Sequence, residues 1–308
     1  MSSRCARKRN GLLPEMSDPH WVGMQAKSDV ASWLRQGRER LNEFSDNPGL
    51  EAQVLLAHVL GQSRAWLLAH PEAGVPPEAG ERLAALLGRL AAGEPLPYLT
   101  GRQEFYGLAF EVTPEVLIPR PETELLVDQA LGWLAVHPQR RLAVDVGTGS
   151  GCIAVSLAVH APDLAVLAVD RSIAALRVAR RNALRHQVDG RLAWVQSDLL
   201  TAADAPLDLV CANLPYIPDA TLAGLRVAQY EPRLALSGGE RGLDLIAALL
   251  ADAPRWLAPG GLLLMEIEAG QGESVLALGR QAFPGADVRL IPDLAGQDRV
   301  VRVERREA

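Results

Sequence analysis

Four consecutive residues, Asn213-Leu214-Pro215-Tyr216, bring together polar and aromatic groups that suit the handling of a nitrogen atom. The Pro215 ring biases Leu214 toward an extended backbone, which aims the Leu214 carbonyl and the Asn213 side-chain oxygen at a common point. Two such acceptors would hold the hydrogens of an NH2 group, and Tyr216 would stack on the planar group that bears it. This alignment would direct a poorly nucleophilic amide nitrogen toward a methyl donor.

A glycine-rich run lies earlier in the chain, directly after an apolar segment. It reads Asp145-Val146-Gly147-Thr148-Gly149-Ser150-Gly151, and its glycines permit a tight turn and close approach to a ligand. Dinucleotide enzymes use a related loop, but here the last glycine falls one position early. The carboxylate of Asp145 could order the loop and meet a ligand's ammonium group. The run therefore favours S-adenosylmethionine, which carries a sulfonium and an ammonium.

Two further acids follow the next two apolar segments. Asp170 could accept hydrogen bonds from ribose hydroxyls, although that role is shared with dinucleotide enzymes. Asp198 could bind an adenine amino group while Leu199 packs on the ring, and Asp198 alone could equally cap a helix. We expect all these residues at the carboxyl ends of strands, where open α/β sheets bind ligands.

The elements that must position these residues alternate along the chain. Short apolar strands are predicted at 142–146, 166–170, 192–196, 207–212 and 261–267, with helices at 150–160, 172–186, 241–257 and 271–281. This alternation predicts a mostly parallel sheet with helices on both faces. The last two strands, 287–292 and 299–304, have no helix between them, so we expect an antiparallel edge and seven strands in total.

The first third of the chain has a different pattern. Apolar residues recur at helical spacing over residues 28–93, and alternation begins near residue 98. Two prolines stiffen the loop Ile118–Glu122, which a helix at 123–136 follows. The predicted organisation is a mobile N-terminal extension at 1–27, a helical domain at 28–94, a β-hairpin connector at 95–118 and the α/β domain at 119–308.

Composition narrows the class of protein. The chain has 308 residues, which favours two domains, and its net charge of -6 does not suggest direct nucleic-acid binding. Three scattered cysteines support neither a metal site nor a disulfide framework. No apolar run is long enough to span a membrane, and no secretory signal is evident. We expect a cytoplasmic monomer without metal.

Several motifs together make the chain resemble the HemK/PrmC family, the glutamine methyltransferases that modify peptide chain release factors. The motifs are Pro97–Gly101, Glu104–Gly107, Ile118–Glu124, Asp145–Ile153, Asn213–Ile217, Tyr230–Pro232, Ala235–Gly239, Gly242-Leu243, Glu266-Ile267 and Asp298–Val300. The resemblance covers about residues 28–305. It implies a Rossmann-like class I methyltransferase domain that binds S-adenosylmethionine and releases S-adenosylhomocysteine.

The resemblance also implies roles for particular residues. The cofactor would be bound by Gly147–Gly151, Asp170, Leu199 and Asn213, and the substrate glutamine by Asn213–Tyr216. The target would be the glutamine of a Gly-Gly-Gln loop in a release factor, methylated at its side-chain amide nitrogen. The helical domain would help to grip that release factor. The family reads Asn-Pro-Pro-Tyr where this chain has Leu214, and we expect activity to survive because leucine also supplies a carbonyl.

Other readings stay open at this point. The same chemistry could act on a glutamine of a ribosomal protein, or on adenine flipped out of nucleic acid. The largely neutral, alanine- and leucine-rich helical domain favours a protein target. A binding module without activity would have lost the acids or acceptors, and an NAD oxidoreductase would need a hydride-transfer set that is not evident. Arg120 and Glu122 could line the cofactor pocket or form a structural ion pair.

Overall fold

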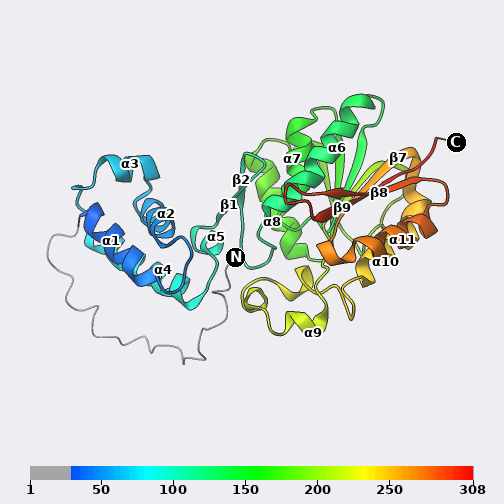
Figure 1. Ribbon diagram of the computed structural model, residues 1–308. Coiled ribbons are helices and arrows are strands. Elements are labelled where there is room, and N and C mark those ends of the chain that lie inside the picture. The colour runs from blue at the N-terminus through cyan, green and yellow to red at the C-terminus, as the bar shows by residue number, and fades with distance from the viewer. Residues whose placement is uncertain (1–28, 308) are drawn as a thin grey trace. The chain divides into compact units, whose positions relative to one another are not determined.

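The computed structural model describes residues 29–307, so the extension expected at 1–27 lies outside the described residues. The chain divides into two compact units, Met1–Thr100 and Gly101–Ala308. In Figure 1 the colour runs along the chain, so the described part of the first unit is blue to cyan and the second unit ends in red. This division falls inside the range 95–118 that was predicted for the connector. Each unit has its own apolar core and is described by itself.

The first unit is helical, as its apolar spacing predicts. Its helices are α1 (Val30–Leu41), α2 (Pro48–Leu60), α3 (Arg64–Ala69), α4 (Pro77–Ala92) and α5 (Leu96–Thr100). Gly61 ends α2 with a φ of 65°, and the Ser63 hydroxyl accepts a hydrogen bond of 3.0 Å from the backbone N–H of Trp66 to cap α3. Trp33 packs over Gly80, where a Cβ would lie 2.6 Å from the indole ring.

The hairpin is shorter than the alternating pattern predicts. Strands β1 (Arg102–Phe105) and β2 (Leu108–Glu111) pair antiparallel, whereas residues 98–100 belong to α5. The prediction that the strand-like alternating pattern of the hairpin begins at residue 98 was therefore wrong. Pro97 lies in the first turn of α5, where its missing N–H costs no hydrogen bond, and the Thr100 hydroxyl donates to the Leu96 carbonyl at 3.2 Å.

The second unit contains the predicted seven-stranded sheet. Its strands are β3 (Leu142–Val146), β4 (Ala165–Asp170), β5 (Leu192–Gln196), β6 (Leu207–Ala212), β7 (Leu257–Glu266), β8 (Asp287–Pro292) and β9 (Asp298–Glu304). They lie in the order β5-β4-β3-β6-β7-β9-β8, and only β9 runs antiparallel to its neighbours β7 and β8 among the pairs of the described sheet. The mostly parallel sheet with an antiparallel edge is confirmed.

Helices cover both faces of this sheet, as Figure 1 shows. One apolar core joins α6 (Glu124–Val136), α7 (Cys152–His160) and α8 (Ile173–Arg185) to the sheet, and a second joins α10 (Asp244–Trp256) and α11 (Gly272–Ala282) to it. Strand order reverses at β3, which lies between β4 and β6. Such a reversal opens a crevice at the carboxyl ends of the strands.

The stretch between β6 and α10 has little regular structure. It holds the short helix α9 (Asp219–Leu222) and the 3-10 turns η4 (Arg226–Gln229) and η5 (Arg233–Ala235). Three further 3-10 turns are η2 (Pro121–Thr123), η3 (Asp189–Arg191) and η6 (Ala269–Gln271). The sequence pattern predicted none of these short elements, because each is shorter than the period that reveals a helix.

Candidate active site

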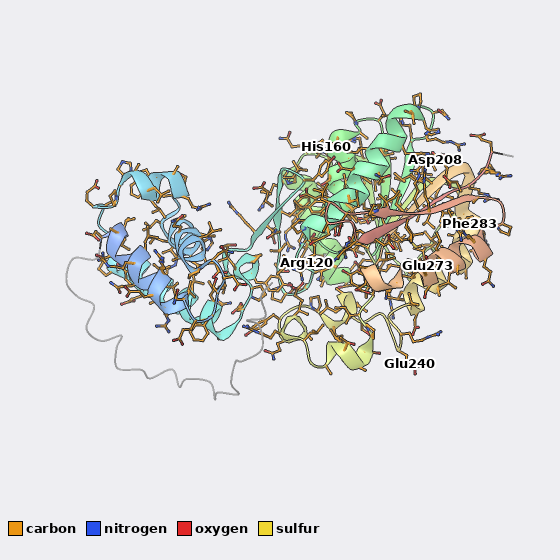
Figure 2. The ribbon with its side chains drawn as sticks, viewed as in Figure 1. Arg120, His160, Asp208, Glu240, Glu273 and Phe283 are labelled. Atoms are coloured by element: carbon orange, nitrogen blue, oxygen red, sulfur yellow. The ribbon has the colours of Figure 1, made fainter. Side chains whose placement is uncertain are left out.

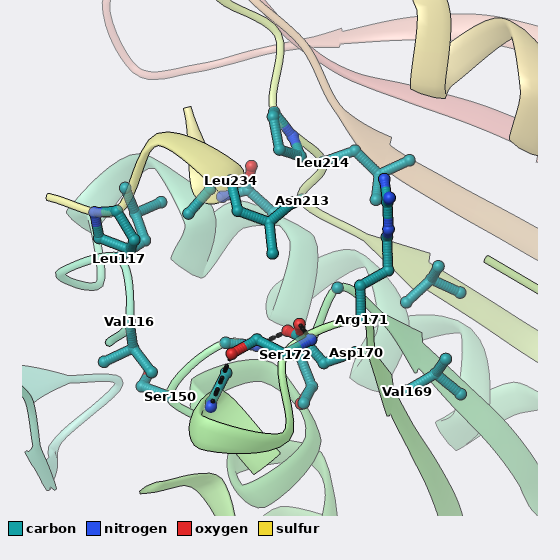
Figure 3. A pocket seen from close by; sticks show the side chains of 18 of the residues that line it. Val116, Leu117, Ser150, Val169, Asp170, Arg171, Ser172, Asn213, Leu214 and Leu234 are labelled. Atoms are coloured by element: carbon teal, nitrogen blue, oxygen red, sulfur yellow. Dashed lines mark hydrogen bonds between the residues drawn. The ribbon is translucent and has the colours of Figure 1, made fainter. Parts of the chain in front are cut away.

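A pocket of about 280 Å³ lies at the carboxyl ends of β3, β4 and β6. Figure 3 shows Ser150, Asp170 and Ser172 on one side of it and Asn213, Leu214 and Leu234 across from them. The predicted site residues that line it are Gly147, Thr148, Gly149, Ser150, Asp170, Asp198, Leu199, Asn213, Leu214 and Pro215. Asp145, Gly151 and Tyr216 are not among the lining residues.

The glycine loop is anchored to strand β4 by backbone hydrogen bonds. The N–H groups of Gly147 and Thr148 both donate to the Val169 carbonyl, at 2.8 and 2.9 Å. Gly147 has a φ of 74°, in the left-handed region, and a Cβ there would lie 3.2 Å from Cδ2 of Leu214. Glycine at this position therefore leaves space free in the pocket next to Leu214.

Asp145 lies beneath the loop, fully buried. Its Oδ2 accepts hydrogen bonds from the Thr148 hydroxyl at 2.6 Å and from the Ala154 N–H at 3.1 Å, so it orders the loop as expected. Its Oδ1 has no hydrogen-bond partner among the described residues. Burial raises the pKa of Asp145 to about 7, and the charge of Asp170 adds to the rise. A contact with a ligand's ammonium stays a prediction.

Asp170 anchors the loop from the next strand. One carboxylate oxygen accepts from the Gly149 N–H at 2.9 Å and the other from the Ser172 N–H at 2.8 Å. Figure 3 labels Asp170 and Ser172 side by side at the pocket. Burial raises the pKa of Asp170, and these backbone donors oppose the rise. Each oxygen keeps a second lone pair, which is the capacity that ribose hydroxyls would use.

Asp198 is exposed at the rim of the pocket. Its carboxylate lies 3.8 Å from Nε of Arg171. A turn, not a helix, follows it: the Thr201 N–H donates to the Asp198 main-chain carbonyl at 3.2 Å. The alternative role of Asp198 as a helix cap is therefore not found.

Asn213 is held by two buried residues to which the sequence pattern gave no role. Its Nδ2 donates to Oγ1 of Thr123 and to Oε2 of Glu266, both at 2.9 Å. Thr123 in turn donates to the same Glu266 oxygen at 2.6 Å. Burial raises the pKa of Glu266. The signal that could have found this contact is the adjacency of β6 and β7, because Asn213 directly follows β6 and Glu266 is the last residue of β7.

The backbone around Tyr216 is clamped to the loop before α10. Gln271 Nε2 donates to the carbonyls of Tyr216 and Gly242, at 3.1 and 3.0 Å. A Cβ on Gly238 would lie 2.7 Å from the Tyr216 Cα, so the two segments pack closely. Burial raises the pKa of Tyr216 to about 12, and nearby Glu266 contributes. Tyr216 is therefore a neutral phenol at ordinary pH.

Arg120, labelled in Figure 2, takes both roles that the sequence left open. It lines the pocket, and its guanidinium lies 2.6 Å from a carboxylate oxygen of Glu231. The other Glu231 oxygen accepts a hydrogen bond of 3.2 Å from the Ile118 N–H. Glu122 is not a lining residue. The sequence analysis gave Glu231 no role.

Two kinds of feature are missing from the part of the chain that the structure describes. Residues 29–307 contain no group of three or more His, Cys, Asp or Glu residues placed to hold a metal ion. Over the same residues, the helices are too short or too polar to cross a bilayer.

Two family models match the chain, one in each unit. They are the PrmC N-terminal domain over residues 32–101 and the methyltransferase small domain over residues 123–229. A release factor glutamine methyltransferase of Moorella thermoacetica is 45% identical over 264 residues, which is 85% of this chain and 93% of that protein. One of Nitratidesulfovibrio vulgaris is 42% identical over 280 residues, covering 88% and 94%.

A solved structure supports the fold of the second unit. The hMettl16 catalytic domain, crystallised with an RNA hairpin, has a TM-score of 0.50 at 15% identity and covers 74% of this chain and 82% of its own. At that identity the likeness concerns the fold alone. With the methyltransferase family model, it identifies a class I methyltransferase fold.

Proposed function

The chain belongs to the HemK/PrmC family of release factor glutamine methyltransferases, and on that premise we propose its substrate and target atom. It transfers a methyl group from S-adenosylmethionine to the side-chain amide nitrogen of the glutamine in the Gly-Gly-Gln motif of peptide chain release factors. The observation that carries this proposal is the arrangement of Asn213 at the pocket wall, with its amide nitrogen bound to Thr123 and Glu266.

The residues around the pocket fit S-adenosylmethionine, which supplies a methyl group on a sulfonium and leaves as S-adenosylhomocysteine. Gly147–Gly151 and Asp170 would hold it, with Asp198 and Leu199 at the adenine. The unpartnered Oδ1 of Asp145 suits a cationic ligand, because a buried acceptor without a partner is costly. The space that a Cβ on Gly147 would fill is also left free.

The catalytic residues would act by holding the glutamine nitrogen. The Asn213 side-chain oxygen and the Leu214 carbonyl accept its two hydrogens, which biases its lone pair toward the methyl donor. Pro215 stiffens this turn, and Tyr216 packs against the planar amide. Orientation and electrostatics supply the rate, since the proton can leave during or after transfer and no strong base is required.

The partner would be a release factor, with the helical first unit contributing to its recognition. The names of the relatives support this target over a ribosomal protein or a nucleic acid. The net charge of -6 also disfavours a strong electrostatic attraction to nucleic acid. We propose that the protein acts as a monomer in the cytoplasm.

The test is to incubate the purified protein and labelled S-adenosylmethionine with a release factor, with ribosomal proteins and with RNA. Mass spectrometry should place the methyl group on the glutamine of Gly-Gly-Gln. Asn213→Ala should abolish transfer while circular dichroism shows an intact fold. Methylation of a ribosomal protein or RNA in place of the release factor would overturn the proposed target.

A further inference from the structure

We propose that Thr123 and Glu266 are positioning residues that fix which end of the Asn213 amide faces the substrate. This inference rests on the proposed function, because it concerns the acceptor that would hold the glutamine nitrogen. The two residues come from different elements: Thr123 ends the turn η2 and Glu266 ends the strand β7.

The orientation matters because the two ends of an amide have nearly the same shape and opposite hydrogen-bonding character. The oxygen of Asn213 accepts hydrogen bonds, whereas its nitrogen donates them. If the amide were turned over, its NH2 group would face the NH2 group of the glutamine. Two donors would then oppose each other and the substrate nitrogen would not be held.

The contacts form a closed set that accepts one orientation. Thr123 donates its hydroxyl proton to Oε2 of Glu266 at 2.6 Å. The Thr123 oxygen then has only acceptor capacity left, and Asn213 Nδ2 donates to it at 2.9 Å. Nδ2 also donates to the same Glu266 oxygen at 2.9 Å. The nitrogen end of the amide therefore faces two oxygens that act as acceptors.

A reversed amide would be costly at this position. Its oxygen would face a carboxylate oxygen and a hydroxyl whose proton is already committed. Thr123 and Glu266 are each only 2% exposed, so water cannot readily repair the mismatch. A buried acceptor without a partner is unfavourable, and its usual cost corresponds to a preference of about five- to 150-fold for the observed orientation.

The framework around the amide is rigid. Strands β6 and β7 pair in parallel, with Ala212 opposite Met265, so the next residues on each strand, Asn213 and Glu266, emerge side by side. Pro121 begins the turn that ends at Thr123. A threonine hydroxyl can donate and accept at once, a serine could replace it, and a valine could do neither.

The constraint on the Asn213 amide requires the negative charge of Glu266, because a protonated carboxyl can donate a hydrogen bond as well as accept one. Its surroundings include the Tyr216 hydroxyl at 3.5 Å, the positive charge of Arg299 and the negative charge of Glu122. Burial raises the pKa of Glu266, and Arg299 opposes that rise. As pH falls through this raised pKa, the constraint on Asn213 should weaken and the turnover rate should fall.

The test compares Thr123→Val, Thr123→Ser and Glu266→Gln with wild type and with the exposed charge control Glu273→Gln. Thr123→Val should lower kcat on a release factor by about tenfold or more, with the Kd for S-adenosylmethionine changed by less than about twofold. Thr123→Ser keeps the hydroxyl, so its kcat should stay near that of wild type. Glu266→Gln should lower kcat and remove the loss of rate at acid pH, and Glu273→Gln should leave both unchanged.

A second measurement does not depend on turnover. In wild type the Asn213 side-chain NH2 protons, seen by NMR, should exchange slowly with water, and Thr123→Val should speed that exchange at least about tenfold. Unchanged exchange and unchanged kcat in Thr123→Val would overturn the inference. A wild-type protein that shows the slow exchange but methylates no release factor would instead overturn the proposed target.

Discussion

The guanidinium of Arg120 lies 2.6 Å from the carboxylate of Glu231, and this ion pair joins two segments that both line the pocket. Glu231 is 5% exposed and also accepts a hydrogen bond from the Ile118 N–H. One carboxylate therefore holds the loop before α6 against the segment that contains Pro232 and Leu234. The shape of the pocket therefore depends on this contact as well as on its glycine loop.

Removing that carboxylate should loosen the pocket. Glu231→Ala leaves a guanidinium unpaired and a backbone donor unsatisfied, so the free energy of unfolding should fall by about 2–4 kcal/mol. The Kd for S-adenosylmethionine should rise about tenfold or more in calorimetry. Glu240→Ala removes an exposed carboxylate nearby in the sequence and should change neither value. Wild-type affinity in Glu231→Ala would contradict this role.

Leu214→Pro restores the residue usual in the family and tests whether the backbone carbonyl is what matters at this position. Leu214 is 5% exposed and packs in the second apolar core, so its loss should lower the unfolding free energy by about 1–3 kcal/mol. Proline would offset up to about 1 kcal/mol of that loss, because it lowers the conformational entropy of the unfolded chain. Methyl transfer at low temperature should stay within a few-fold of wild type. A folded variant without transfer would refute the carbonyl role.

Gly147→Ala should damage cofactor binding through both strain and contact. A non-glycine residue at a φ of 74° costs roughly 1–2 kcal/mol, and the new Cβ would lie 3.2 Å from Leu214. We expect the Kd for S-adenosylmethionine to rise at least about tenfold. Gly285→Ala is the matched control, because Gly285 has a φ of 82° and open space around it. Equal affinity in both variants would show that Gly147 is not required.

Asp145 should make stability depend on pH. Burial raises its pKa from 3.8 to about 7, so the folded chain binds the proton more tightly than the unfolded chain. This stabilisation is complete below the unfolded pKa and is lost as pH rises through the folded pKa. Between about pH 5 and about pH 8, wild type should lose about 2–3 kcal/mol relative to Asp145→Asn.

Urea denaturation at the two pH values measures this difference. The control is Asp204→Asn, an exposed position that should leave the pH slope of wild type unchanged. If wild type and Asp145→Asn showed parallel pH slopes, Asp145 would titrate at the same pH in the folded and unfolded chains, and its raised pKa would be wrong.

The parallel part of the sheet could be predicted from sequence because its strands are short, mostly apolar runs; β3 is followed by Gly147 and β4 ends in Asp170. Strands β3 and β6 were predicted with the residue bounds that the structure shows. The position of the glycine loop and of Asp170 followed from the same pattern. In each case the signal is local, since a parallel strand buried on both faces is mostly apolar along its length.

The rest depends on contacts between residues far apart in the chain. Thr123 and Glu266 meet at Asn213 only because η2 and β7 converge there. The segment from Asn213 to α10 lacks a helical or strand period, and its shape is fixed by backbone packing at Gly238 and by Gln271. Local spacing carries no information about either arrangement.

Asn182 connects the hairpin to the glycine loop without recognising any side chain. Its Oδ1 accepts from the Glu111 N–H at 2.7 Å, and its Nδ2 donates to the carbonyls of Glu111 and Ser150 at 3.0 and 2.9 Å. All three partners are main-chain atoms, which any amino acid except proline at position 111 would supply. The link between β2 and the glycine loop is therefore insensitive to the side chain at position 111, whereas the hairpin's attachment to the apolar core depends on the buried rings of Phe105 and Phe110.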